Sequence, residues 1–408
     1  MSAAHLAEKD DGLKRVALTH REEAVSRLER EVLRTDQTIQ SIDTVYSDFN
    51  LVVLFICILL GMTDSWHNPT MLGLKYLHSA RLLFKRLSPV VIDSVQSTKE
   101  RNSIRFIAGI MAYWEALVSF LKDQPLNATS YLSSFVDESY DIIPSNPWTG
   151  VSTPLFIYLA RVGALGRQRE TMQKLNLSSL ALDAEERIQA TLTKKAREIE
   201  MALLGYRIPP LDKIEQTHDI QTPVIHLQKT AQIFRLTALL EVYLSFPELF
   251  TSCAREFSSS ECDSSYRLEI SRPSKMLSLA TGILTIISTL PLDSGTNVIL
   301  CLPLIVAGSA LQYSSPASTS QKIGLFDELA NIHNEQGVHE HWRSFVRERL
   351  KYIHRFVGLA SVLRALEVVE RTWFRADVQR IADKQGMSES FVHWTNVMVD
   401  ERLETIFG

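Results

Sequence analysis

Glycine and proline, the residues that most often interrupt helices, are rare in this chain and lie in clusters. The 408 residues include 16 glycines and 14 prolines. They gather near 61–73, 144–154, 205–223, 272–273, 291–295 and 303–316. Between these clusters, apolar residues recur at intervals of three and four, and no strand-like alternation of β-branched residues persists. The sequence therefore predicts an all-α protein, a large irregular multi-helix bundle.

The longest stretch without such interruptions runs from Gly12 to Gly61. Its apolar residues follow one another in steps of three and four, and charged residues flank them in the first half, as in a coiled coil. The seam comprises Val25, Leu28, Val32, Ile39, Ile42 and Phe49. Residues 1–49 are therefore predicted to form a charged, heptad-patterned N-terminal helix, and residues 50–408 the helical domain. The helix is either a coiled-coil arm that dimerises two chains or an amphipathic helix on its own bundle.

One apolar stretch, "LDSGTNVILCLPLIVAGSALQ" at 292–312, raises the question of a membrane span. Its apolar run is shorter than the roughly 20 residues that cross a bilayer as a helix, and so is "LVVLFICILLGM" at 51–62. No membrane association is expected. The stretch is predicted to be a helix that begins at Asp293 or Ser294, is buried on every face and is bent by Pro303. Ala307 and Gly308 would let a neighbouring helix approach closely.

Composition and motifs give no sign of catalysis or of direct DNA binding. The net charge of −4 provides no basic footprint for a duplex. Nucleophile elbows, phosphate loops and dinucleotide fingerprints do not occur in the sequence, and no cofactor is expected. The four cysteines match no zinc pattern, and Cys57 and Cys301 are expected to pack as small apolar residues.

Histidines and basic residues of the C-terminal third are candidate binding sites. His333, His339 and His341 with Glu340 are the best metal candidates, but His339 and His341 point apart on a helix, so a surface helix is favoured and no metal site is predicted. The basic segment 342–356 is expected to be a solvated helix face. The glycines of "VGALG" at 162–166 are interpreted as a packing feature.

Several segments together resemble one family, the C-terminal regulatory domain of fungal zinc-cluster transcription factors. "TGVSTPLFIYLARVGALGRQR" resembles its Gly-Val-Ser-x-x-Leu-Phe segment, and "AQIFRLTALLEVYLSF" its Arg-containing helix. "LPLIVAGSALQ" resembles its Pro-Leu-Phe-x-Ala-Gly segment, and "HWTNVMVDERLETIFG" its closing Trp-x-x-Val-Met helix. The segments stand in the family order between about residues 45 and 408. The residues that carry the resemblance are Gly150, Val151, Ser152, Arg235, Pro303, Gly308, Trp394 and Met398.

The resemblance implies a nuclear transcriptional regulator whose helical domain, residues 50–408, senses a small-molecule effector and controls a metabolic or secondary-metabolite pathway. Members of the family usually begin with six cysteines that hold two zinc ions, and these 408 residues contain no such cluster. Either the cluster is naturally absent or an upstream exon is missing. The chain would then reach DNA only indirectly, as a homodimer or as a heterodimer with a DNA-binding relative. The alternative is a helical enzyme or small-molecule carrier in a biosynthetic pathway.

Overall fold

The computed structural model describes residues 11–37, 45–93, 98–136, 141–175, 182–249, 272–313, 325–382 and 391–407. These residues form helices and loops, and their only β-pairing is two isolated bridges, so the all-α prediction is confirmed. The α-helices are α2 Asp11–Gln37, α3 Val45–His67, α4 Leu74–Asp93, α5 Thr98–Ser119, α6 Thr153–Leu175, α7 Leu182–Gly205, α8 Val224–Ser245, α10 Arg272–Ser288, α11 Cys301–Ser309, α12 Leu325–Val357, α13 Ala360–Ala382 and α14 Trp394–Asp400. The 3₁₀ helices are η1 Ser130–Phe135, η3 Leu211–Lys213 and η4 Gly295–Ile299. Within the described ranges, no helix is both long and apolar enough to span a bilayer.

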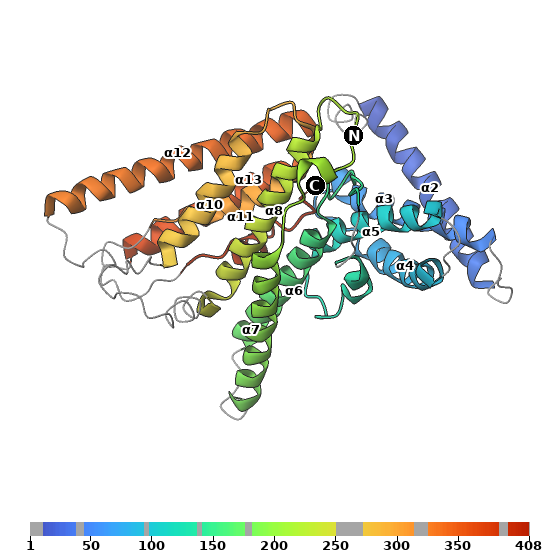
Figure 1. Cartoon of the computed structure of the whole chain (residues 1–408), viewed down its shortest axis with the longest axis horizontal. Helices are drawn as coiled ribbons and strands as arrows, with labels where there is room; N and C mark the ends of the chain where they lie inside the picture. The colour runs from blue at the N-terminus through green and yellow to red at the C-terminus, as the bar shows by residue number, and fades with distance from the viewer. Residues whose placement is uncertain are drawn as a thin grey trace.

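Helices α6 and α8 occupy the middle of the bundle (Figure 1). On one side α6 packs against α5, behind which lie α4, α3 and α2, and on the other side α8 packs against α10 and α11. Helices α12 and α13 form the far end and run beside α11 (Figure 1). The central helices α6 and α8 therefore connect the N-terminal helices to the C-terminal ones.

Glycines on α6 permit the close packing at this centre. A Cβ on Gly163 would lie 2.1 Å from Ser119 Oγ of α5, and one on Gly166 would lie 2.8 Å from Ser245 Oγ of α8. Both distances are shorter than van der Waals contact, so neither position accepts a side chain without movement. The prediction that the glycines of 162–166 serve packing is confirmed.

The apolar stretch 292–312 differs from its prediction in two respects. Helix α11 begins at Cys301, after the separate 3₁₀ turn η4, and not at Asp293 or Ser294. Pro303 therefore lies in the first turn of α11, where a backbone N–H has no partner within the helix, and the predicted bend is wrong. All residues of α11 are buried, as predicted. A Cβ on Gly308 would lie 3.1 Å from Val346 of α12 and 3.2 Å from Val369 of α13, which confirms the expected close approach.

The N-terminal seam is described in its first part only. Leu28 is buried in the core of its own chain, Val25 packs against that core, and Arg21 pairs with the buried carboxylate of Asp64 on α3. The side chains of Val32, Ile39, Ile42 and Phe49 lie outside the described residues, as does the 38–44 backbone between α2 and α3. The coiled-coil dimer and the boundary at residue 49 stay predictions.

The basic segment 342–356 is only partly solvated, contrary to its prediction. Arg343 and Arg349 are buried. Arg343 pairs with Asp377 at 2.8 Å, and Arg349 donates to Leu290 O at 3.0 Å and to Asn297 Oδ1 at 2.9 Å. These guanidinium groups hold the turn before α11 and the α12–α13 pair in place, so they are not available to phosphate.

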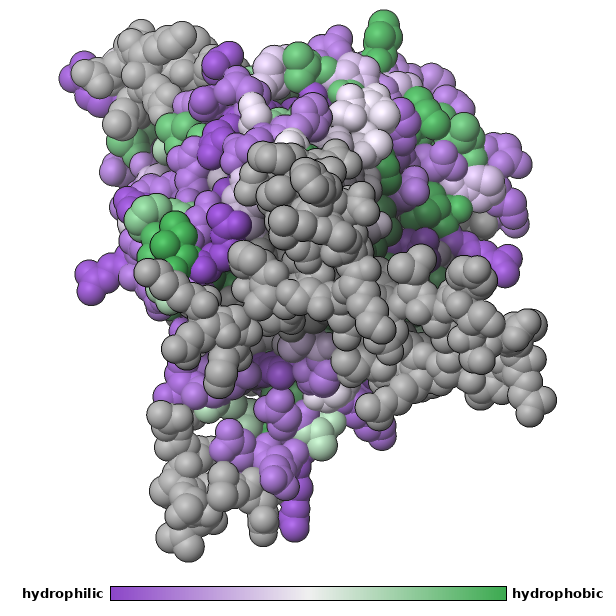
Figure 2. All heavy atoms as spheres, turned by 90° about the vertical axis from the view of Figure 1, so that its left-hand side faces the viewer, coloured by the Kyte–Doolittle hydropathy of each residue, from purple (hydrophilic) through white to green (hydrophobic). Residues whose placement is uncertain are grey.

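The end of the molecule formed by α10, α12 and α13 has a mostly hydrophilic surface where its atoms are coloured, with separate hydrophobic patches (Figure 2). Phe374 and Ile381 of α13 are among the exposed apolar side chains, at 64% and 67%. Scattered exposed apolar side chains such as these are normal on a protein surface. The continuous apolar region of the described chain is its buried core.

Candidate functional site

Three of the segments that carry the family resemblance meet at one polar pocket. The C-terminal part of α6, the end of α8 and the beginning of α14 enclose a volume of about 230 Å³, which we name the α6–α8–α14 pocket. Its polar lining residues are Arg169, Glu170 and Gln173 from α6 and Ser245 from α8, together with Asn396 of α14 and His393, the residue that precedes α14. Leu244, Pro247 and Phe391 provide an apolar wall.

Local interactions fix the ends of the helices around the pocket. Arg169 donates to the carbonyl of Ser245 at 2.8 Å, and its guanidinium also pairs with Glu248 at 2.9 Å. A cation at this place satisfies a carbonyl of the last turn of α8 and opposes the negative end of the helix dipole. Helix α14 starts immediately after His393, whose Nδ1 lies 3.3 Å from the N–H of Thr395 and caps the helix when that nitrogen is unprotonated.

His393 stands between two carboxylates. Its Nε2 lies 3.2 Å from Glu241 Oε1, and its Nδ1 lies 2.7 Å from Thr395 Oγ1. The Thr395 hydroxyl donates to Glu170, whose Oε1 is 3.9 Å from His393 Nδ1. A protonated ring can thus donate to Glu241 on one side and, through Thr395, reach Glu170 on the other.

The environment favours that protonated ring. Burial lowers the pKa of His393, but the charge and the hydrogen bond of Glu241 and the charge of Glu170 raise it, and Arg167 opposes them weakly. The net effect raises the pKa of His393 above its ordinary value. Glu241 is only 1% exposed and also accepts a bond from Trp394 Nε1 at 3.0 Å. The imidazolium therefore provides Glu241 with the positive partner that a buried carboxylate requires.

Glu170 and Arg167 extend the ionic network from α6 to the loop after α5. Arg167 pairs with Glu170 at 2.9 Å and with Asp123 at 3.4 Å. Sequence reasoning did not select Glu170, Glu241 or His393. Glu241 carries a usable signal, since it is a lone carboxylate within the apolar run "LLEVYL". Glu170 lies among polar residues and carries none, and His393, between Val392 and Trp394, carries no signal that names its carboxylate partner.

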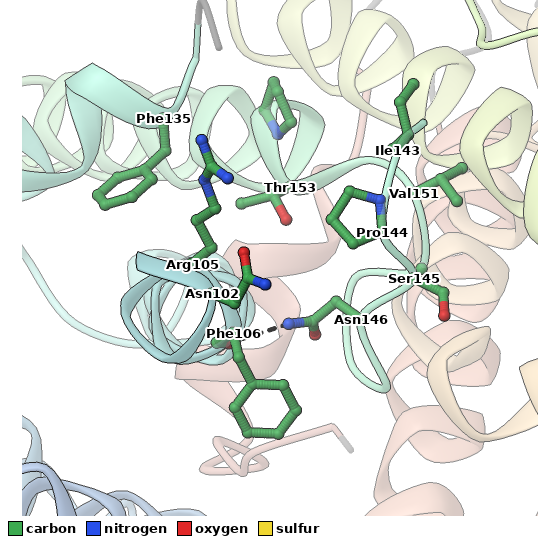
Figure 3. Close-up of a pocket in the computed structure, with 12 residues that line it drawn as sticks. Asn102, Arg105, Phe106, Phe135, Ile143, Pro144, Ser145, Asn146, Val151 and Thr153 are labelled. Atoms are coloured by element: carbon green, nitrogen blue, oxygen red, sulfur yellow. Dashed lines mark hydrogen bonds between the residues drawn. The ribbon is translucent and has the colours of Figure 1, made fainter. Parts of the chain in front are cut away.

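A second, smaller hollow lies beside the Gly-Val-Ser segment (Figure 3). It encloses about 110 Å³, with Asn102 and Arg105 of α5 on one side and the 143–154 loop on the other. Asn146 ties the two sides together, because its amide donates to Phe106 O at 2.9 Å and its Oδ1 accepts from Trp148 N at 3.0 Å. This hollow is bounded by a structured turn and is small for a ligand.

The predicted family residues have mainly structural positions. Gly150 has φ +58° in the turn closed by its two hydrogen bonds with Asn146, a conformation that favours glycine, and Val151 and Ser152 are buried beside it. Arg235 donates to the carbonyls of Leu203 and Leu204 and so caps the end of α7. Of the rest, Pro303 and Gly308 lie in α11, Met398 is fully buried, and Trp394 lies beside the α6–α8–α14 pocket.

The other candidates are separated by the structure. His339 is buried with Nε2 3.2 Å from Gln312 O, His341 is exposed, and Glu340 accepts from Tyr313. The side chain of His333 is outside the described residues, and the described ones contain no group of three or more metal-ligating side chains. Burial raises the pKa of the Cys57 thiol to about 11 and that of Cys301 to about 12, which supports their interpretation as packing residues.

The comparisons with known proteins identify the family. A family model described as "Fungal specific transcription factor domain" matches residues 1–408. The chain belongs to this family. No curated protein and no solved structure matches the chain. Membership in the fungal-specific transcription factor domain family supports a role as a regulator of transcription, and such a role implies a nuclear protein. In this family member, the resemblance segments of α6, α8 and α14 surround the pocket described above.

Proposed function

We propose that this transcription factor domain senses a small-molecule effector in the α6–α8–α14 pocket. The observation that carries the proposal is the pocket itself, a polar cavity of about 230 Å³ with a buried imidazole–carboxylate network. Its volume is below the roughly 300 Å³ at which pockets for drug-sized ligands begin, so it suits only a molecule of few atoms, and its polar groups converge from three helices. An effector that binds differently to two arrangements of these helices would shift the population between them.

A partner chain is the second part of the proposal. The 408 residues contain four cysteines and carry a net charge of −4, so these residues by themselves offer no zinc cluster and no basic surface for DNA. We propose that the chain dimerises through the seam of residues 25–49 with itself or with a DNA-binding relative, and that it controls the genes of a metabolic or secondary-metabolite pathway. The heptad pattern supports the dimer, and the family supports the regulation.

Chromatin occupancy of the tagged chain in its native cell tests the partner-mediated role. Discrete promoter peaks are expected for the wild type, and Ile39→Asp is expected to abolish them, because a buried charge in the seam opposes pairing. A flat profile for a well-expressed wild-type chain would contradict the proposal.

Transcript levels at the occupied promoters test effector sensing. Asn396→Leu, which changes the pocket lining, is expected to alter those levels and leave occupancy intact. Asn102→Leu is the matched control, because Asn102 is an exposed amide that lines the smaller hollow of Figure 3. Equal transcript levels in the wild type and both variants would remove the pocket from the regulatory mechanism.

A further inference from the structure

The lining of the α6–α8–α14 pocket contains a cation whose hydrogen-bonding capacity is only partly used. Arg169 makes its hydrogen bonds through Nη1, to Ser245 O at 2.8 Å and to the two carboxylate oxygens of Glu248 at 2.9 Å. A guanidinium has five N–H donors, and three of them belong to Nε and Nη2. In Arg169 these two nitrogens donate to no group in the described part of the chain, and neither is fully buried. Arg169 therefore offers an open Nε–Nη2 edge at the pocket.

The acidic side chain of the lining, in contrast, is already occupied. Glu170 Oε2 accepts from Arg167 at 2.9 Å, and Glu170 Oε1 accepts from the Thr395 hydroxyl. A ligand that donated to Glu170 would compete with these two donors, whereas a ligand that accepts from Arg169 would displace nothing. The charged lining therefore favours a ligand with acceptor atoms.

The charge of the lining is compatible with an anion. The chargeable lining residues are Arg169, Glu170 and His393, so the lining is net positive when the imidazole ring is protonated. The partner of Arg169, Glu248, lies on the Nη1 side of the guanidinium and is 37% exposed. Water therefore screens the repulsion between Glu248 and an anion at the Nε–Nη2 edge.

We propose that the α6–α8–α14 pocket binds small molecules through a carboxylate, which accepts two parallel hydrogen bonds from Nε and Nη2 of Arg169. The planar edge of a guanidinium matches the two oxygens of a carboxylate, so this bidentate pairing uses the open donors best. The apolar wall of Leu244, Pro247 and Phe391 accommodates a short carbon body attached to the carboxylate. The ligand class is thus a short-chain carboxylic acid in its ionised form. This inference rests on the proposed function, since it names the chemistry of the effector that the pocket receives.

Three probes of one carbon skeleton test the class of the ligand. Butanoate, butylamine and butanol are titrated into the full 408-residue chain, and binding is followed by ligand-observed NMR, which detects weak affinities. Butanoate is expected to bind, and butylamine and butanol are expected to bind far more weakly or not at all. Preferred binding of butylamine or butanol would overturn the carboxylate class, and its loss in Asn396→Leu would retain the pocket as an effector site. Absence of binding by all three would overturn the carboxylate class and the effector role of the pocket together.

A conservative variant locates the binding at Arg169. Arg169→Lys keeps a positive charge that can still bond to Ser245 O and to Glu248, but it removes the two-donor edge. The variant is expected to keep a melting temperature close to that of the wild type and to weaken butanoate about ten- to a hundredfold, since hydrogen bonds to a charged group are the stronger ones.

Arg161→Lys is the matched control for this variant. Arg161 lies on the same helix, donates to Ser133 Oγ at 2.9 Å and is not part of the pocket lining. Arg161→Lys is expected to bind butanoate as the wild type does. Unchanged butanoate affinity in Arg169→Lys, or an equal loss in both variants, would overturn the proposal.

Discussion

His393 retains its proton more tightly in the folded chain than in the unfolded one, because Glu241 and Glu170 raise its pKa. The folded state therefore binds more protons around neutral pH, and the free energy of unfolding falls as pH rises. This stabilisation is fully present below the ordinary histidine pKa of about 6.5 and is lost as pH rises through the folded-state pKa. Denaturant unfolding measured across this pH range is expected to show the decline.

A substitution can remove the titrating ring of His393 and leave a side chain that caps α14. Asn at position 393 can still cap α14 but does not titrate, so His393→Asn is expected to flatten the pH dependence. His78→Asn is the control, because His78 is exposed on α4. A slope that persists in His393→Asn and disappears in His78→Asn would show that another group carries the effect.

The residues of this network illustrate the limit of sequence reasoning at the residue scale. A carboxylate within the apolar run around Glu241 indicates a buried charge, and the sequence therefore suggests that a partner exists. The partner, His393, is 152 positions away, and its apolar neighbours Val392 and Trp394 do not indicate which charge it meets. Only the packing of α14 beside α6 and α8 brings the two together, so the pocket could not be predicted in advance.

At the scale of elements, Arg349 of α12 holds the end of α10. It is 5% exposed and donates to Ile287 O at 3.4 Å, to Leu290 O at 3.0 Å and to Asn297 Oδ1 at 2.9 Å. Arg349→Met is expected to lower the free energy of unfolding by about 2–4 kcal/mol, because it leaves buried acceptors without a donor. Arg347→Met, on a more exposed face of α12, is expected to cost less than about 1 kcal/mol in the same denaturation experiment. Equal losses in the two variants would contradict the assigned role of Arg349.

Helix α11 offers a second comparison at this scale. Pro303 lies in its first turn, and Pro303→Ala is expected to change the free energy of unfolding by less than about 1 kcal/mol. Gly308→Val is expected to cost about 1–3 kcal/mol, because its new atoms would press on Val346 and Val369. Thermal and denaturant unfolding of both variants measure the difference. If Pro303→Ala lowered the free energy of unfolding more than Gly308→Val does, the result would support the bent helix that the sequence predicts.

The start of α11 shows why helix boundaries are harder to predict than helices. Apolar periodicity predicted an all-α bundle, yet the predicted start of this helix at Asp293 or Ser294 is seven or eight residues too early. Asn297 explains the difference, because its side-chain amide donates to the carbonyls of Pro291, Leu292 and Ser294 and holds a turn there. Such side-chain contacts to the backbone compete with helix formation and leave no periodic signal.

At the scale of the whole molecule, the described part of the N-terminal seam docks on its own chain. Leu28 is 7% exposed and Val25 packs on the same core, so the first residues of the seam are occupied within their own chain. The Arg21–Asp64 ion pair fastens α2 to α3 at this place. A dimer would therefore use the later seam residues, Ile39 and Ile42 among them, unless α2 first detached.

Two substitutions distinguish docking from dimerisation. Leu28→Ala is expected to cost about 2 kcal/mol and to speed hydrogen exchange in α2, since it leaves a cavity against the core. Ile39→Asp is expected to convert a dimer into a monomer, measured by light scattering, with little change in the exchange of α2 before residue 30. A wild-type monomer would favour the amphipathic helix on its own bundle. If Leu28→Ala also dissociated the dimer, docking of α2 on its own core and pairing of the seam would be coupled. The reason would be that a helix not held on its own core cannot place its later seam residues in a fixed position for the partner.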